Sequence, residues 1–256
     1  MKNTNRISDA IRENKTAIGV HVASADICFY EMAGSMGYDY IWIDTEHSAM
    51  TLPMVLSGVA AANAGGSSVI VRLAKNDPIL AKPVLDMGVQ GIVFPMVNTA
   101  AEAEMAVKSC IYPPLGNRGF GPLRASWYGE VPTREYMDTA DKTILKMIQI
   151  EHVDAVKNLP EILKVEGIDV IICGPMDLSA SIGKAGQMDD PEVVDLFETI
   201  AEACKTAKIP FGTSIGWNPK LFEYWLSKGV SCISMGDPVG YFREMGIKVL
   251  KDYRGK

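Results

Sequence analysis

The chain has 256 residues, of which 48% are hydrophobic and 22% charged, and it carries a formal net charge of −6. A chain of this length and apolar content can bury a large core, and a single α/β-barrel domain over residues 1–256 accounts for all of it. The acidic balance argues against a surface that binds nucleic acid or an anionic membrane. These properties are those of a soluble enzyme.

Cysteine usage and the amino-terminal stretch both indicate the cytoplasm. Five cysteines are scattered along the chain, most of them in apolar segments and none in C-x-x-C spacing: Cys28, Cys110, Cys173, Cys204 and Cys232. This pattern predicts buried thiols in a reducing compartment rather than a disulfide frame or a zinc site. Residues 1–15 mix both charges without an apolar signal core, and no run approaches the roughly 18 residues of a membrane span.

Apolar runs alternate with helical patterns along the chain. After a short helix over 8–14, strand candidates span 17–22, 40–44, 68–72, 91–95, 144–150, 169–173, 210–214 and 231–235. Helical patterns follow them at 27–36, 52–64, 79–87, 100–110, 156–165, 193–205, 219–227 and 239–253. Strict alternation of eight strands with eight helices predicts a (β/α)8 TIM barrel, with a doubly wound open sheet as the alternative. In the barrel, the chemistry lies at the carboxyl ends of the strands.

Two strand candidates end in carboxylates. The run 144–150 stops at Glu151, and the run 169–173 is followed by Asp177. The helical pattern between them completes a βαβ unit, whose right-handed crossover makes the strands parallel neighbours. The two carboxylates therefore leave the sheet at the same end and repel each other unless a proton or a cation lies between them. A divalent ion such as Mg or Mn meets this need, whereas the alternative is that each is a helix cap or a surface acid.

The second and third strand candidates also end in charged groups. His47 follows Asp44 by three residues, so a turn could let this carboxylate hold one imidazole nitrogen and leave the other to act as a base. Arg72 ends an apolar run, and its guanidinium predicts an anionic partner at the rim. The partner is either a substrate oxygen or, in a structural ion pair, the carboxylate of Glu46 or Asp44. His21, at the end of the first run, is a weaker candidate for the same rim. Together these groups suit the breaking or making of a carbon–carbon bond beside a ketone.

One connection is irregular. Residues 111–142 are too long for an ordinary barrel crossover and contain YPPLGNRGFGPLRASWYG. Its glycine, proline, arginine and aromatic content suits a folded loop over the active face. The alternative is a surface insertion used for subunit contacts.

Seven motifs in order point to a known family: IDTEH (43–47), VRLAKNDP (71–78), VLDMG (84–88), VFPMV (93–97), YPPLGNRGFG (112–121), QIE (149–151) and CGPMDLS (173–179). Over about residues 18–193 the chain resembles the metal-dependent (class II) pyruvate aldolases of the HpcH/HpaI type. That group includes 2,4-dihydroxyhept-2-ene-1,7-dioate aldolase and the 2-keto-3-deoxy sugar-acid aldolases. The resemblance implies a phosphoenolpyruvate/pyruvate-type barrel and an aldehyde-lyase that cleaves a 4-hydroxy-2-oxo acid reversibly to pyruvate and an aldehyde.

The resemblance also implies roles for single residues. Glu151 and Asp177 would bind a divalent cation, Mg, Mn or Co, which pyruvate chelates; Arg72 would contact the keto or enolate oxygen. His47 paired with Asp44 would shuttle the proton. Support for the substrate would come from Gln149, Gly174 and Met176. Relatives are typically homohexamers, trimers of dimers, with the carboxyl-terminal helix exchanged between subunits, and Asp86 matches a residue that approaches a neighbour's site.

Two stretches depart from the family pattern where the aldehyde should bind. Thr45 stands where many relatives have glycine, and GTSIGWN (212–218) is less apolar than usual. Two other readings stay open. One is a citrate-lyase or malyl-CoA type lyase, against which the chain shows no basic groove suited to CoA phosphates. The other is a barrel that binds a metal and an oxo acid without turning the acid over.

Overall fold

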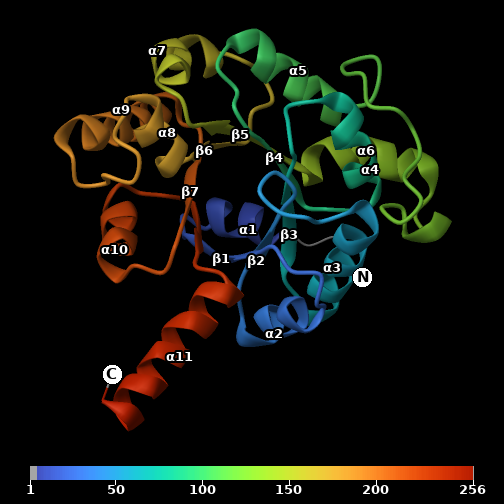
Figure 1. Cartoon of the computed structure of the whole chain (residues 1–256). Helices are drawn as coiled ribbons and strands as arrows, with labels where there is room; N and C mark the ends of the chain where they lie inside the picture. The colour runs from blue at the N-terminus through green and yellow to red at the C-terminus, as the bar shows by residue number, and fades with distance from the viewer. Residues whose placement is uncertain (1–4, 256) are drawn as a thin grey trace.

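Eight parallel strands close into a barrel in the computed structural model, which describes residues 5–255; the first four residues of the mixed-charge amino-terminal stretch lie outside it. Each strand pairs with the next along the chain, and the last pairs with the first (Figure 1). The strands are β1 (Ala17–Val22), β2 (Tyr40–Asp44), β3 (Ser68–Arg72), β4 (Gly91–Phe94), β5 (Leu145–Ile150), β6 (Val170–Cys173), β7 (Phe211–Ile215) and β8 (Cys232–Met235). The predicted TIM barrel is confirmed, and the open sheet is wrong.

Helices surround the barrel wherever helical periodicity predicts them. They are α1 (Arg6–Arg12), α2 (Cys28–Met36), α3 (Leu52–Gly65), α4 (Pro78–Asp86), α5 (Ala100–Cys110), α7 (Val153–Ile162), α9 (Pro191–Ala207), α10 (Pro219–Ser227) and α11 (Pro238–Arg254). Three further elements were not predicted: the 3-10 turn η1 (Trp127–Gly129), α6 (Thr133–Thr143) and α8 (Pro175–Ser181). Helix α6 is mostly polar, with Tyr136 and Ala140 as its buried residues, and α8 has only seven residues, so both offer few apolar positions from which to predict a helix.

The period of two along each strand decides which side chains enter the barrel. On β2, Tyr40 and Trp42 belong to the interior cluster, whereas Ile41 and Ile43 pack outward against the helices. One further step along the same face brings Asp44 to the carboxyl end, on the inner side. The same alternation runs through Met147 on β5 and continues to Gln149 and Glu151. Polar groups at the ends of the strands therefore converge above an apolar interior.

The opposite end of the barrel is closed. Helix α1 covers it with Ile7, which is fully buried in the interior cluster beside Ala17 and Tyr40. Asn5 caps this helix and donates to the carbonyls of Gln90 and Thr143. Access to the interior is therefore from the carboxyl ends of the strands.

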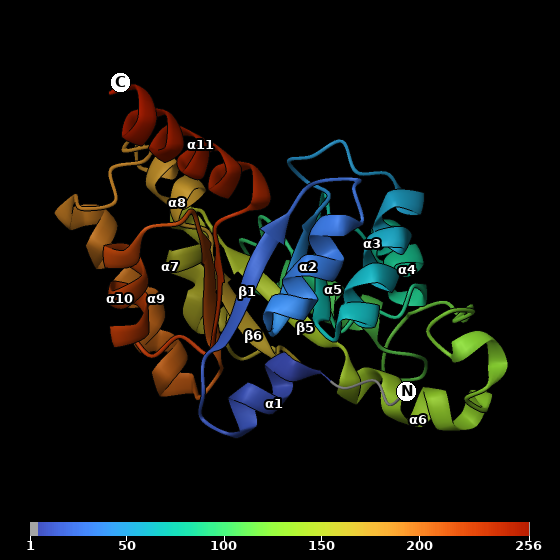
Figure 2. The same cartoon turned by 90° about the horizontal axis from the view of Figure 1, so that it is seen from below.

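The long connection does not cover the mouth, so the prediction of a loop over the active face is wrong. Arg124 donates to the carbonyl of Met87, and the backbone of Ala125 donates to that of Asp86, just before β4 begins. These contacts lie at the amino ends of the strands, and Figure 2 shows the green segment at the same end of the molecule as α1. Sequence composition alone could not reveal this, because both ends of a barrel accept Gly- and Pro-rich loops.

Helix α11 projects from the barrel (Figure 1). None of its residues is buried, although several are large and apolar or aromatic. Phe242, for example, is 82% exposed and Tyr253 86%. Its first turn is fixed by Tyr241, whose hydroxyl donates to the carbonyl of Met235. None of the helices within residues 5–255 combines the length and the apolar character that crossing a membrane requires. All five cysteines are free thiols; four are buried as predicted, whereas the prediction of a buried thiol is wrong for Cys28, which is exposed.

Candidate active site

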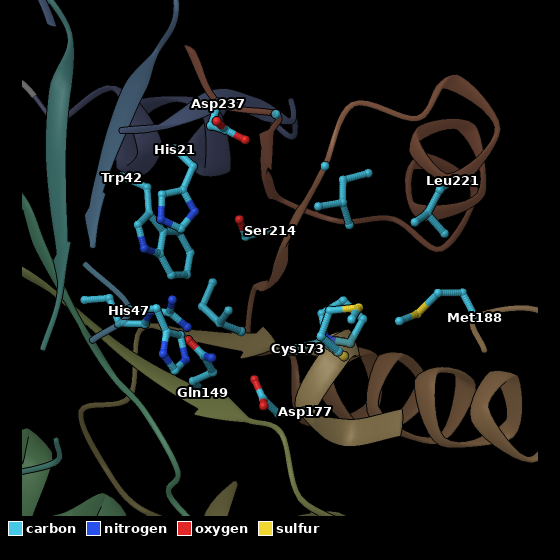
Figure 3. A pocket seen from close by; sticks show the side chains of 18 residues that line it. His21, Trp42, His47, Gln149, Cys173, Asp177, Met188, Ser214, Leu221 and Asp237 are labelled. Atoms are coloured by element: carbon cyan, nitrogen blue, oxygen red, sulfur yellow. The ribbon is translucent and has the colours of Figure 1, made fainter. Parts of the chain in front are cut away.

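A pocket of about 340 Å3 opens at the carboxyl ends of the strands. Its polar lining includes five residues that the sequence singled out: His21, His47, Arg72, Gln149 and Asp177. Figure 3 shows His21, His47, Gln149 and Asp177 coming from different parts of the chain and facing one space, with Met188 and Leu221 on an apolar wall. The barrel thus brings together groups that are up to 156 positions apart in the chain, since His21 and Asp177 belong to β1 and α8.

Arg72 is held by two carboxylates. Its Nε and Nη2 lie 2.9 and 2.7 Å from Oδ1 and Oδ2 of Asp44, and its Nη1 lies 3.1 Å from Oε2 of Glu46. The register of β2 and β3 places Asp44 directly beside Arg72, which makes this two-pronged contact possible. Burial alone would raise the pKa of Asp44, but hydrogen bonds from His21 and Arg72 outweigh it and hold the pKa well below its usual range. Asp44 is therefore a permanent anion.

The predicted pairing of Asp44 with His47 is wrong in this structure. Asp44 contacts His21 instead, with 3.4 Å between Oδ2 and Nε2, and the imidazole of His21 stacks on Trp42. His47 has its Nε2 at 3.7 Å from Oε2 of Glu46 and a largely exposed side chain. The reason is direction: Asp44 points into the barrel, whereas His47 lies beyond the strand in the following turn. The spacing of Asp44 and His47 shows that they are near each other in the chain, but it does not show where either side chain points.

Glu151 is almost fully buried next to two residues that line the pocket, Gln149 and Gly174. Its Oε1 accepts a hydrogen bond from the backbone N–H of Met96 at 2.6 Å, and its Oε2 accepts one from Nε2 of Gln149. Burial raises the pKa of Glu151 to about 7, and the nearby carboxylates of Glu46 and Asp177 add to the effect. Such a group takes up either a proton or a cation close to neutral pH.

The carboxylates of Glu151 and Asp177 fit a divalent cation whose other ligands come from solvent and substrate. Asp177 is exposed and lines the pocket, and its charge acts on Glu151. Over residues 5–255 no group of three or more acidic, histidine or cysteine side chains is placed to hold a metal ion. Two carboxylates with water and substrate oxygens suit Mg or Mn. The buried Oε1 of Gln149 also lacks a partner within the described residues, which leaves an acceptor for a bound water or ligand.

The β6–α8 turn lines the pocket. A Cβ atom at Gly174 would lie 2.7 Å from Oε2 of Glu151, so only glycine lets the backbone approach that carboxylate. Met176 follows in α8 and lines the pocket. Both predicted substrate contacts therefore face the same space as Asp177.

Asp86 is the predicted site residue that the structure places elsewhere. It ends α4 near the amino ends of the strands, where its Oδ1 lies 3.1 Å from Nη2 of the buried Arg118. Arg118 in turn contacts the rings of Tyr112 and Tyr136 and donates to the hydroxyl of Tyr136. Within this chain, Asp86 anchors the long connection. An approach to a neighbour's site stays a prediction.

Two residues that line the pocket, Ser214 and Asp237, and one that contacts Arg72 beside it, Glu46, received little attention in the sequence analysis. Glu46 was weighed only as an ion-pair partner, Ser214 only as a hydroxyl on the seventh strand, and Asp237 not at all. The signal for Ser214 was available, since on β7 it shares a face with Gly212, two residues earlier. Asp237 follows β8 and caps α11 by accepting a hydrogen bond from Gly240, so its residue type indicates a helix cap as readily as a site.

Comparisons with known proteins agree with the fold and identify the family. The model of the HpcH/HpaI aldolase/citrate lyase family matches residues 17–242. A 4-hydroxy-2-oxo-heptane-1,7-dioate aldolase of Klebsiella pneumoniae is 35% identical over 234 residues, covering 91% of this chain and 87% of the relative. A 2-keto-3-deoxy-L-rhamnonate aldolase of Salmonella gallinarum is 34% identical over 238 residues, with the same coverage of 91% and 87%.

A solved structure of a HpcH/HpaI aldolase/citrate lyase family protein from Burkholderia cenocepacia is 27% identical and superposes with a TM-score of 0.91. The superposition covers 98% of this chain and all of the other. The family match spans the strands from β1 to β8 and therefore every strand end that faces the pocket. The chain belongs to the HpcH/HpaI aldolase/citrate lyase family.

Proposed function

We propose that the protein is a divalent-metal-dependent aldolase that cleaves a 4-hydroxy-2-oxo acid reversibly to pyruvate and an aldehyde. The observation that carries the proposal is that Arg72 and Asp177 line one pocket, while Glu151 is buried next to it and hydrogen-bonded to the lining residue Gln149. Membership of an aldolase and citrate lyase family supports carbon–carbon bond chemistry, and two curated relatives are named as aldolases of oxo acids.

Glu151 and Asp177 would hold the cation, with Mg, Mn or Co as the candidates. When bound, the cation would polarise the keto group of the oxo acid as a Lewis acid. Glu151 is shielded from water and anchored by the backbone of Met96, so its carboxylate is fixed in place before substrate arrives. Gln149 orients Glu151 through one end of its amide and offers the other end to the site.

Arg72 is positioned for the oxygen that gains charge as the carbon–carbon bond breaks. Its guanidinium lines the pocket while Asp44 and Glu46 fix its plane, so the donor needs no reorientation during the reaction. His47, beside Glu46 at the open rim, is the candidate to carry the proton. In cleavage the base takes the proton of the C4 hydroxyl, the C3–C4 bond breaks, the aldehyde leaves, and the pyruvate methyl group gains a proton.

Exchange of the pyruvate methyl protons tests the proposal without knowledge of the aldehyde. The purified protein is incubated with pyruvate and Mg or Mn in deuterium oxide, and the loss of the methyl proton signal is followed by NMR. We expect exchange that EDTA abolishes and added metal restores. Binding of metal and pyruvate without exchange would instead favour a barrel that only binds its ligands. Exchange that survives EDTA, or a borohydride-trapped lysine adduct, would indicate a Schiff base.

We also propose that the protein works as a homo-oligomer in which α11 packs on another copy, with the hexamer as the family expectation. Support comes from the exposed apolar residues of α11, which include Phe242, Met245 and Tyr253. Light scattering after size exclusion measures the mass directly. A monomer at micromolar concentration would contradict this assembly.

A further inference from the structure

We propose that the aldehyde partner is a neutral molecule that carries hydroxyl groups, held by an acceptor subsite of His21, Ser214 and Asp237, and that the site disfavours aldehydes bearing a carboxylate. This inference rests on the proposed function and specifies its second substrate. Figure 3 shows the three side chains on one side of the pocket, with Gln149 and Asp177 on the other. The subsite comes from β1, β7 and the turn after β8, whereas the groups for pyruvate come from β2, β3, β5 and α8.

Among the described residues that line the pocket, no lysine and no second arginine beside Arg72 is present to pair with a carboxylate on the acceptor. The guanidinium of Arg72 already contacts Asp44 and Glu46, and the proposed pyruvate oxygen takes the remaining face. On the acceptor side stands Asp237, a carboxylate. An anionic aldehyde would lose hydration there without gaining an opposite charge.

The same three side chains can bind hydroxyl groups. His21 uses Nε2 toward Asp44, which leaves Nδ1 for a ligand. Ser214 makes no hydrogen bond to another side chain or loop backbone within residues 5–255 through its hydroxyl, and Asp237 uses Oδ1 for Gly240, leaving Oδ2 as an acceptor. The subsite therefore offers both hydrogen-bond donors and hydrogen-bond acceptors, as a polyhydroxylated ligand requires.

A third side of the pocket is apolar and fits a carbon chain. Met188 and Leu221 lie on it (Figure 3), so an acceptor with hydroxyl groups toward the subsite and C–H groups toward these side chains matches both surfaces. The hydroxyl of Ser234, which lies beside Ser214 in the β7–β8 register, is buried without a partner among the described residues, although Ser234 is not among the residues that line the pocket. Segment 212–218, which departs from the usual family sequence, supplies Ser214 and part of this surface.

The experiment compares three aldehydes as acceptors for pyruvate with Mn: glyceraldehyde, propanal and succinic semialdehyde. Propanal has the carbon chain of glyceraldehyde without its hydroxyls, and the semialdehyde adds a carboxylate. We expect kcat/KM for glyceraldehyde to exceed that for each of the others by about tenfold or more, because unpaired polar groups and like charges both weaken binding. A semialdehyde that reacts as well as glyceraldehyde, or a propanal that does, would overturn the subsite.

Two variants tie the preference to the named residues. Asp237→Asn removes the charge but keeps a good helix cap, so the ratio of semialdehyde to glyceraldehyde kcat/KM should rise about tenfold. Ser214→Ala should lower the ratio of glyceraldehyde to propanal several-fold. Ratios within one protein cancel general damage to the fold. Ratios unchanged in both variants would refute the assignment.

Methyl-proton exchange on the same preparation separates the two proposals. Exchange without a preference for the hydroxylated acceptor overturns the acceptor subsite alone. Absence of exchange overturns the proposed function, and the subsite with it.

Discussion

Replacing Glu151 by glutamine should make the metal-free protein more stable at pH 8. Burial raises the pKa of Glu151 from its ordinary value of 4.5 to about 7 in the folded chain. The folded state therefore binds the proton more tightly than the unfolded state does. The resulting stability is fully present below pH 4.5 and is lost as the pH rises through about 7.

The size of the effect follows from the two pKa values. At about 1.36 kcal/mol per pKa unit, the difference corresponds to about 3 kcal/mol lost between acid and neutral pH. Glutamine resembles the protonated carboxyl group and never ionises, so Glu151→Gln avoids this loss. For a chain of this size, that stability difference is a rise in Tm on the order of 5–10 °C at pH 8. Below pH 4.5 the two proteins should unfold at similar temperatures.

Thermal unfolding followed by circular dichroism, in EDTA from pH 4 to pH 8, measures the difference. Glu166→Gln, which removes an exposed carboxylate of the same type, is the matched control and should follow the wild type. Saturating Mn should reverse the order of stability at pH 8, because only the wild type keeps both carboxylates for the cation. A Glu151→Gln variant with a lower Tm than the wild type in EDTA at pH 8 would refute the reasoning.

Three further substitutions test single groups by methyl-proton exchange or metal binding. Arg72→Lys keeps the charge but loses the two-pronged contact with Asp44, so exchange should slow by on the order of 10²–10³; an unchanged rate would mean that Arg72 is only structural. His47→Ala should slow exchange by roughly 10²–10⁴ with little change in Tm, since its side chain is largely exposed; normal exchange would assign the proton transfer to another group. Asp177→Ala should weaken Mn binding in calorimetry and leave cooperative unfolding intact, whereas an unfolded variant would favour a structural role.

The sequence by itself determined the barrel and most of its inner rim. Apolar runs of strand length fixed eight strands to within one residue at each end, because parallel strands buried on both faces must be continuously apolar. Carboxylates that follow two such runs had to emerge at the same end, and in the structure Asp177 lines the pocket while Glu151 is buried against the lining residues Gln149 and Gly174. Local chemistry and the crossover rule were sufficient for these conclusions.

Only the tertiary structure decided how the rim groups pair. Asp44 meets Arg72 because β2 and β3 are in register there, and it meets His21 because β1 brings that imidazole to its other side. Spacing along the chain favoured His47 as the partner of Asp44. Sequence shows which residues are near each other in the chain, but not the direction of a side chain after the strand has ended. The position of the long connection, residues 111–142, was likewise decided by the tertiary structure. Its composition predicted a folded loop, but its packing beside Asp86 depends on contacts between segments that are distant in sequence, and these form only when the barrel closes.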